Sequence, residues 1–167
     1  MVEVIGDIWD YHGKGILAIT TNGYVSKDGR AMPGQGVARQ AAERFPQLLR
    51  ELGEAIRTGG NHVFELAHGL VSFPVEDSPW SLPDQRLIRR SAGELRELAD
   101  LKGWPLIVVP RPGCGGGGLE WREVATILKD LFDDRFHVIH AASPGSSGRR
   151  TPKGSSRNSN HDQNPPL

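Results

Sequence analysis

The sequence predicts an α/β fold, in which strands and helices alternate along the chain. Apolar runs of strand length, such as Leu106 to Val109, are separated by segments whose apolar residues recur at helical spacing. Two of the helical segments are entered through glycine-rich turns, at Gly34 to Gly36 and at Gly113 to Gly118. With 167 residues, the chain has the size of one domain with a sizeable core.

Two predicted strands near the start of the chain are followed by polar residues. Met1 to Ile5 is the first strand and runs into Gly6-Asp7, and Gly15 to Thr20 is the second and leads to Asn22. A turn or a helix cap would account for Asp7, and Asn22 can either form a turn or bind a ligand. Ligands of open α/β sheets collect at the carboxyl ends of strands, which is where Asn22 is expected.

The middle of the chain is predicted to contain two helices and a strand pair. A short helix opens at Gly34-Gln-Gly36-Val-Ala38, and Leu48 to Ile56 carries the apolar face of the next helix. His62 to Leu66 and Gly69 to Phe73 have the composition of paired strands. Pro74 to Trp80 is predicted to be the loop that follows them.

The second half of the chain is predicted to add a long helix, a strand, a shorter helix and a last strand. The long helix begins near Ser81 to Asp84, where Ser and Asp three residues apart resemble a capping box, and Gly103 ends it. Trp104 to Val109 is the next strand, and Phe136 to His140 closes the sheet. The helix between them carries Trp121, Val124, Ala125, Leu128 and Leu131 at helical spacing.

The glycine-rich loop after the strand at Leu106 to Val109 is a predicted phosphate site. Glycines have no Cβ, so their backbone N–H groups can lie against an anion, and the helix that follows directs its positive end to the same point. The loop lacks the Gly-Lys-Ser/Thr ending of a Walker loop and comes too late in the chain for a Rossmann fingerprint. A plain connector is the alternative. A second glycine turn at Gly34 to Gly36 indicates two anion cradles, as a diphosphate would need.

Composition and charge indicate a soluble, cytoplasmic protein with a basic tail. Twenty basic residues balance twenty acidic ones, a single cysteine excludes an internal disulfide, and no run is apolar enough for a signal peptide or a membrane span. Residues 1–140 contain 16 basic and 19 acidic residues, whereas residues 141–167 contain four basic and one acidic. The tail is rich in Ser, Gly, Pro and Arg and is predicted to be disordered. It is expected to be solvated, with weak nucleic-acid binding as the alternative.

Five short motifs, taken in order, resemble those of the macro domain family, which binds ADP-ribose. The resemblance covers residues 2–140 and implies a three-layer α/β/α fold with a mixed, mostly parallel central sheet. It implies ADP-ribose or an ADP-ribosylated macromolecule as the partner, no cofactor and no metal; the chain is expected to be a monomer. The motifs are Gly6-Asp-Ile8, Asn22, Gly34-Gln-Gly-Val-Ala38, Ser72-Phe-Pro74 and Pro112-Gly-Cys-Gly-Gly-Gly-Gly-Leu-Glu-Trp121.

The resemblance also implies how the ligand is bound. Asp7 would accept a hydrogen bond from the adenine amino group, the backbone at Ile8 would meet a ring nitrogen, and Asn22 would hold the distal ribose. The two glycine loops would wrap the diphosphate and the distal ribose through backbone N–H groups. The candidate ligand-binding residues are Asp7, Ile8, Asn22, Gly34, Gly36, Val37, Gly113, Cys114, Gly115, Gly116, Gly117, Gly118 and Leu119.

The catalytic groups of the family's hydrolases do not carry over to this chain. One branch has a Lys shortly after the Phe-Pro strand, where this chain has Glu76, and some members have an Asp where it has Gly117. Another branch has an Asp at the position of Ala38. Glu76 and Asp28 are the first candidates to replace these catalytic groups, and Asp77 and His12 are weaker ones. The alternative for each of them is an ordinary loop residue without a catalytic role.

Cys114 precedes a predicted helix N-terminus, which would lower the pKa of its thiol and make it a conceivable nucleophile. A small residue buried beneath the loop is the alternative that we favour for it.

The predicted function is therefore binding of ADP-ribose or a derivative, with catalysis left open. The first alternative is an ADP-ribosyl glycohydrolase or an ADP-ribose 1''-phosphate phosphatase with unusual residues. The second is a protein that contacts nucleic acid through its basic tail.

Overall fold

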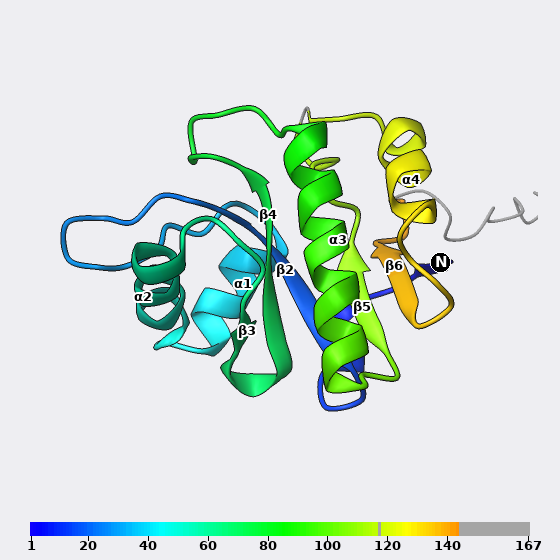
Figure 1. The fold of residues 1–167 in the computed structure, drawn as a ribbon, viewed down its shortest axis with the longest axis horizontal. Helices are drawn as coiled ribbons and strands as arrows, with labels where there is room; N and C mark the ends of the chain where they lie inside the picture. The colour runs from blue at the N-terminus through cyan, green and yellow to red at the C-terminus, as the bar shows by residue number, and fades with distance from the viewer. Residues whose placement is uncertain (117, 144–167) are drawn as a thin grey trace, which may run out of the picture.

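The computed structural model describes residues 1–116 and 118–143, which fold around a six-stranded sheet (Figure 1). The strand order is β1-β6-β5-β2-β4-β3, and all pairings are parallel except that of β3 with β4. The sheet is thus mixed and mostly parallel, as predicted. Its strands are β1 (Val2–Ile5), β2 (Ile16–Asn22), β3 (Glu65–Leu66), β4 (Leu70–Glu76), β5 (Ile107–Pro110) and β6 (Phe136–His140).

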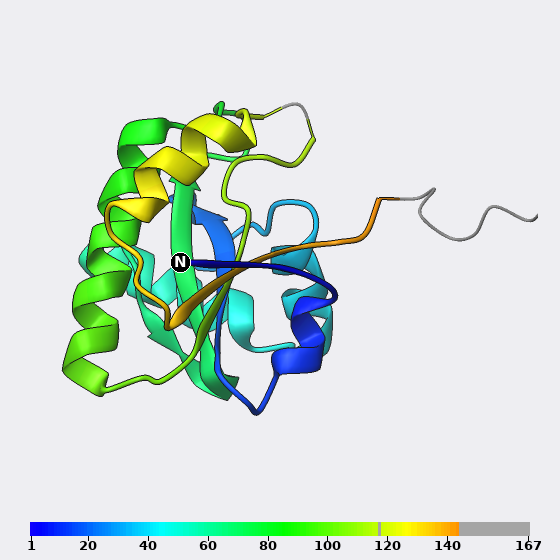
Figure 2. The same ribbon diagram turned by 90° about the vertical axis from the view of Figure 1, so that its right-hand side faces the viewer.

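Helices cover both faces of the sheet, which confirms the three-layer α/β/α architecture (Figure 2). In this part of the chain, α3 and α4 pack on one face, and α1, α2 and the 3-10 helix η1 pack on the other. A second 3-10 helix, η2, joins β3 to β4. The bounds are η1 (Ile8–Tyr11), α1 (Val37–Arg44), α2 (Leu48–Gly59), η2 (Ala67–Gly69), α3 (Gln85–Lys102) and α4 (Trp121–Lys129).

Alternation along the buried strands divides their side chains between two cores. Ala18 on β2 faces the core under α3 and α4, whereas its neighbours Leu17 and Ile19 face the core under α1 and α2. Successive strand side chains point to opposite faces, so a strand covered on both sides must be apolar throughout. This is why the sequence shows unbroken apolar runs rather than alternating ones.

Two strands run further than the sequence predicts. β2 continues through Asn22, and β4 continues through Pro74 to Glu76, where a loop was predicted. The two strands pair in parallel from Leu17 with Leu70 up to Asn22 with Glu76, with a register shift between Thr21 and Asn22. Pro74 is tolerated in the strand, and its carbonyl accepts a hydrogen bond from the buried Ser91 hydroxyl at 2.7 Å.

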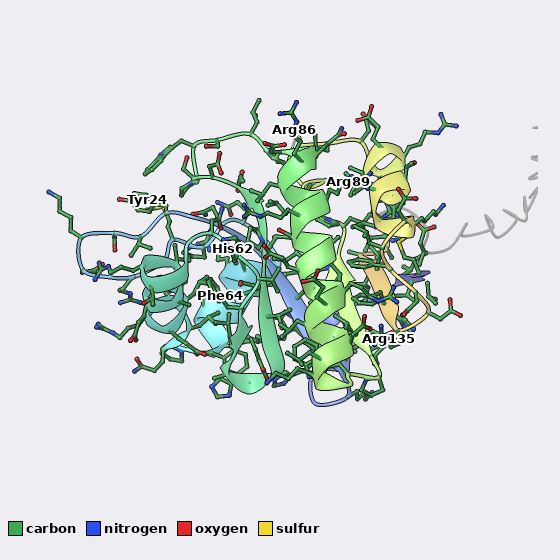
Figure 3. All side chains as sticks on the ribbon, viewed as in Figure 1. Tyr24, His62, Phe64, Arg86, Arg89 and Arg135 are labelled. Carbon is green, nitrogen blue, oxygen red and sulfur yellow. The ribbon has the colours of Figure 1, made fainter. Side chains whose placement is uncertain are left out.

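The strand predicted for His62 to Leu66 is wrong except for Glu65–Leu66. The backbone N–H of Val63 donates to the Glu94 carboxylate at 2.9 Å, and that of Phe64 donates to the Ser72 hydroxyl at 2.8 Å. Side chains thus accept these two N–H groups, while the backbone N–H of Ser72 on β4 donates to the Phe64 carbonyl at 3.0 Å. His62 and Phe64 can be followed there, between α2 and α3, in Figure 3.

The predicted capping box of α3 is also wrong. Asp84 is itself the N-cap residue, and its carboxylate accepts a hydrogen bond from the backbone N–H of Arg86 at 2.8 Å. The Ser81 hydroxyl instead bonds that of Ser78 at 2.7 Å. The predicted end of the helix is correct, because Gly103 adopts the left-handed conformation with φ of 67°.

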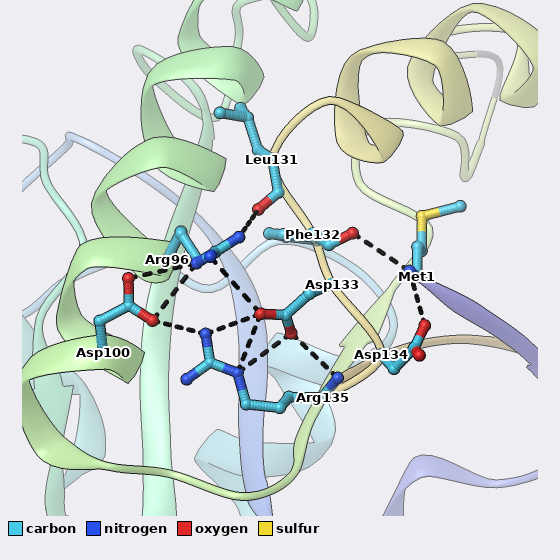
Figure 4. A network of polar contacts seen from close by, with 8 residues as sticks. All are labelled: Met1, Arg96, Asp100, Leu131, Phe132, Asp133, Asp134 and Arg135. Atoms are coloured by element: carbon cyan, nitrogen blue, oxygen red, sulfur yellow. Dashed lines mark hydrogen bonds and ion pairs between the residues drawn. The ribbon is translucent and has the colours of Figure 1, made fainter.

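An ion-pair network joins α3 to the segment before β6 (Figure 4). The Arg135 guanidinium contacts the Asp133 carboxylate at 2.9 Å and the Asp100 carboxylate at 2.5 Å. These bonds to Arg135 lower the pKa values of both Asp100 and Asp133. The amino group of Met1 donates to the carbonyl of Phe132 at 3.1 Å, so the segment before β6 also anchors the start of the chain.

No helix of residues 1–116 and 118–143 is long and apolar enough to cross a membrane. The last strand ends at His140, and the predicted disordered tail lies outside the described residues from residue 144 onward.

Candidate functional site

A cavity of about 810 Å³ opens where β1, β5 and β6 end. Its wall combines the segment after β1, the first turns of α1, the end of β6, and the loop between β5 and α4. Segments that are far apart in sequence therefore meet at one place. The lining residues are Gly6, Asp7, Ile8, Val37, Gln40, Pro110, Arg111, Cys114, Gly115, Gly118, Leu119, Glu120, Trp121, Ile139, His140 and Ala141.

Asp7 and Ile8 lie side by side in the cavity wall. Asp7 is the N-cap of η1, and its Oδ1 accepts a hydrogen bond from the backbone N–H of Trp9 at 2.9 Å. The other carboxylate oxygen has no partner among the described residues, so it is free to accept a hydrogen bond from a ligand. The side chain of Ile8 is buried in the core beneath and anchors this segment. The cap role therefore leaves room for the ligand role expected of Asp7.

The loop between β5 and α4 is closed tightly at its base and open at its tip. The backbone N–H of Leu119 donates to the carbonyl of Gly113 at 2.6 Å. A Cβ at Gly118 would overlap that same carbonyl oxygen, whereas a Cβ at Gly115 or Gly116 would meet nothing. Gly115, Gly118 and Leu119 line the cavity, and Gly113 closes the loop behind them.

The expected ligand-binding position Gly117 lies outside the described residues. Gly113 and Gly116 lie in the same loop but do not line the cavity.

The glycine turn before α1 lies next to the cavity, and the residue that follows the turn, Val37, is part of the cavity wall. Gly36 is the N-cap of α1 with φ of 72°, a conformation that other residues rarely adopt. A Cβ added at Gly34 or Gly36 would contact no other residue, and neither glycine is part of the cavity wall. Val37 does line the cavity, together with Gly115 and Gly118. The start of α1 and the second glycine loop therefore open onto the same surface.

Asn22 does not line the cavity. It is buried, its Nδ2 donates to the carbonyl of Met32 at 3.0 Å, and its Oδ1 accepts from the backbone N–H of Tyr24 at 3.0 Å. These are the contacts of a residue that shapes a turn, which is one of the two roles expected from the sequence.

The carboxylates suggested as catalytic replacements lie away from the cavity. Glu76 ends β4, and burial raises its pKa. Asp28 lies in a turn where the Ser26 hydroxyl donates to its carboxylate, and this bond lowers the pKa of Asp28. That turn is joined to α2 by the hydrogen bond from the Ala31 N–H to the Leu49 carbonyl, at 2.8 Å. The structure does not bring either carboxylate to the cavity wall.

The two weaker candidates are also used elsewhere. The carbonyl of Asp77 accepts from the backbone N–H of Gly23 at 3.0 Å, and Nε2 of His12 is 2.9 Å from the carbonyl of His68. His12 lines a separate, smaller pocket of about 370 Å³.

Cys114 lines the cavity but has the environment of a packing residue. Burial raises the pKa of its thiol, against a smaller lowering by Arg111. Its Sγ donates to the carbonyl of Pro112 at 3.4 Å, and its side chain packs against the core under α3 and α4. The thiolate needed for a nucleophile is thus disfavoured, in agreement with the alternative favoured from the sequence.

Arg111 is a cavity residue that sequence reasoning missed. Its guanidinium carbon lies 4.6 Å from the ring centroid of Trp121, and its nearest carboxylate, Glu3, is 3.8 Å away. Glu3 accepts a much shorter hydrogen bond, 2.8 Å, from the indole N–H of Trp121. The guanidinium is held on the indole face with one loose ion pair, so its charge remains available to an anion. Its place directly before the Pro112 to Trp121 motif was the signal.

Gln40, Glu120 and His140 also line the cavity and were not among the candidates. Glu120 belongs to the Pro112 to Trp121 motif of the sequence analysis. Gln40 and His140 carried no such signal, because one occupies the polar side of a short helix and the other ends a strand. In the described residues, no three His, Cys, Asp or Glu side chains form a group that could hold a metal ion.

The fold is similar to that of several solved macrodomain structures. The macrodomain of Thermus aquaticus DarG is similar with a TM-score of 0.69 and 21% identity, over 86% of this chain and 97% of that one. The macrodomain of Mycobacterium tuberculosis DarG gives 0.66 and 20%, over 83% and 95%. The structure of Thermosipho africanus DarTG in complex with ADP-ribose gives 0.68 and 19%, over 90% of this chain and 42% of that one.

The present chain therefore has the macrodomain fold. No family model matches its sequence, and the search of curated proteins finds no match. At about one identical residue in five, the likeness is one of fold.

Proposed function

We propose that the cavity binds ADP-ribose or a close derivative of it. The observation that carries the proposal is the meeting of three distant segments in one wall, represented by Asp7, Val37 and Gly118. The similar structure of Thermosipho africanus DarTG is a complex with ADP-ribose, which supports the same ligand class here. The cavity volume of about 810 Å³ falls within the range of about 300–1,000 Å³ that is usual for small-molecule sites.

The chemistry of the wall suits the two ends of such a ligand. The free carboxylate oxygen of Asp7 is an acceptor for the amino group of adenine. The open tip of the second glycine loop and the first turn of α1 supply backbone N–H groups for a diphosphate. Arg111 adds the positive charge that backbone amides lack, because its ion pair with Glu3 is loose.

Binding is favoured over hydrolysis by the placement of the acidic residues. Glu76 and Asp28 do not reach the cavity, and the carboxylates in its wall are those of Asp7 and Glu120. Asp7 is assigned to the adenine end, which leaves Glu120, the N-cap residue of α4, as the carboxylate beside the second glycine loop. A glycohydrolase or phosphatase activity would have to use Glu120 to position water.

Calorimetric titration with ADP-ribose tests the proposal. Asp7→Asn keeps the Oδ1 acceptor that caps η1 and replaces the free oxygen by an amide donor, so affinity should fall at least about tenfold without loss of the cap. Asp10→Asn is the matched control, because Asp10 lies in the same short helix and outside the cavity wall. Absence of heat at millimolar ligand would reject the proposed function, and equal affinities for the wild type and Asp7→Asn would reject the adenine end of the site.

A further inference from the structure

Gln40 presents an amide group to the cavity in a single orientation. It lies on α1 and lines the cavity wall. The indole Nε1 of Trp9 donates a hydrogen bond to Oε1 of Gln40 at 2.7 Å. Because an indole nitrogen can only donate, the oxygen of the amide must face Trp9 and the nitrogen must face away from it. Nε2 of Gln40 makes no hydrogen bond to another described residue, so both of its N–H groups remain to be used.

Trp9 is held firmly enough to keep Gln40 in place. The guanidinium carbon of Arg44 lies 4.2 Å from the centroid of the Trp9 ring, in the geometry of a cation–π contact. Gln40 and Arg44 are four residues apart on α1, so they lie on one helix face and both contact the Trp9 indole. The rings of Phe45 and His12 pack against Trp9 at centroid distances of 6.3 and 6.2 Å. A flip of the Gln40 amide would forfeit its bond to a fixed partner.

The same tryptophan also positions Asp7. The backbone N–H of Trp9 donates to Oδ1 of Asp7, and its side chain donates to Gln40. One residue therefore fixes an acceptor, the free oxygen of Asp7, and a donor, Nε2 of Gln40, in the wall of one cavity. The edge of adenine offers the complementary pair, an amino donor at N6 and an acceptor at N7. A glutamine commonly reads that edge with both of its amide atoms; here its oxygen is already bound by Trp9.

We infer that Gln40 is a base-specificity residue, which donates a hydrogen bond to the N7 ring nitrogen of a purine whose 6-amino group is bound by Asp7. This inference rests on the proposed function, because it takes the ligand to be of the ADP-ribose type. Trp9 is the positioning residue that orients both groups. Guanine and hypoxanthine carry an oxygen at position 6, which would face the Asp7 carboxylate as a second acceptor. The site thus selects adenine over the oxo purines.

A cycle of two proteins and two ligands tests the inference. Gln40→Glu keeps an oxygen for the Trp9 indole and removes both N–H donors, and 7-deaza-ADP-ribose replaces the N7 nitrogen by C–H. The wild type should bind ADP-ribose about fivefold to tenfold more tightly than the 7-deaza analogue, as the loss of one hydrogen bond implies. Gln40→Glu should lose this preference or reverse it. Gln47→Glu, an exposed change of the same kind outside the cavity wall, should retain it.

Trp9→Phe provides the test of positioning. It removes the indole N–H and leaves Gln40 intact, so the preference for ADP-ribose over the 7-deaza analogue should shrink although the donor is still present.

The outcomes separate the inference from the proposed function. A wild-type protein that binds ADP-ribose but does not discriminate against the 7-deaza analogue, or a Gln40→Glu variant that discriminates as the wild type does, overturns the role of Gln40 alone. A wild-type protein that binds neither ligand overturns the proposed function and the inference with it.

Discussion

The closure of the second glycine loop gives the sharpest test of how the site is built. A Cβ at Gly118 would overlap the carbonyl oxygen of Gly113, and contacts of a Cβ below 3.0 Å require something to shift. The obstacle is backbone rather than a flexible side chain, and it is the same carbonyl that accepts the 2.6 Å hydrogen bond from Leu119. Gly118→Ala must therefore open the base of the loop.

The expected cost follows from what is lost. Breaking the Leu119 hydrogen bond costs about 0.5–1.5 kcal/mol, and residual strain brings the loss of unfolding free energy to about 1–3 kcal/mol. At about 2–4 °C for each kcal/mol in a domain of this size, the melting temperature should fall by about 2–12 °C. Affinity for ADP-ribose should fall at least about tenfold, because the backbone N–H groups at Gly115 and Gly118 no longer converge.

Gly93→Ala is the matched control for this change. Gly93 lies inside α3, and a Cβ there would meet nothing. The same substitution should raise stability by about 0.5–1 kcal/mol, since alanine is the better helix former, and should leave binding unchanged. Thermal unfolding followed by circular dichroism, with calorimetric titration on the same samples, measures both effects. Wild-type stability and affinity in Gly118→Ala would refute the account of a loop closed by backbone contact.

Two further predictions concern charged groups. Arg111→Met should weaken binding of ADP-ribose much more than binding of adenosine, because only the former carries the phosphates that its guanidinium would meet; equal losses would place Arg111 outside the phosphate end. Arg135→Gln should lower the melting temperature near neutral pH, with Arg89→Gln, whose ion pair is looser, as the control. Asp100 and Asp133 have lowered pKa values in the folded state. Their contribution to the free energy of unfolding is therefore present above about pH 4, and it is lost as the pH falls through these lowered pKa values. The difference in melting temperature between Arg135→Gln and the wild type should therefore vanish in acid. A difference that stays constant across the pH range would contradict this account of the ion pairs.

Local pattern was sufficient for most of the elements of this fold. The apolar runs became β2, β5 and β6, the apolar faces became α2, α3 and α4, and Gly103 ends α3 as predicted. The error at His62 to Leu66 occurred where side chains replaced backbone acceptors. The backbone N–H groups of Val63 and Phe64 donate to the side chains of Glu94 and Ser72 rather than to backbone carbonyls, and no periodicity in the sequence reports such contacts.

The candidate site likewise has residues that the sequence identified and residues that only the structure placed. Asp7, Ile8, Val37, Cys114 and the second glycine loop were found from motifs, because the backbone needs of a phosphate loop leave a glycine signature. The sequence left open whether Asn22, a polar residue at the end of a strand, forms a turn or binds a ligand. Its hydrogen bonds to Met32 and Tyr24 assign it to the turn, and only the structure shows these bonds. Asp28 and Glu76 were chosen for their chemistry alone, and tertiary structure carries them away from the cavity.

By itself, the sequence determined the order of the elements and the two glycine turns, since both depend on which residues can adopt a local conformation. Only the tertiary structure decided which side chains share a wall. The convergence of Asp7, Gln40, Arg111 and Glu120 depends on the order of strands in the sheet, and strand order is set by packing between residues that are distant along the chain.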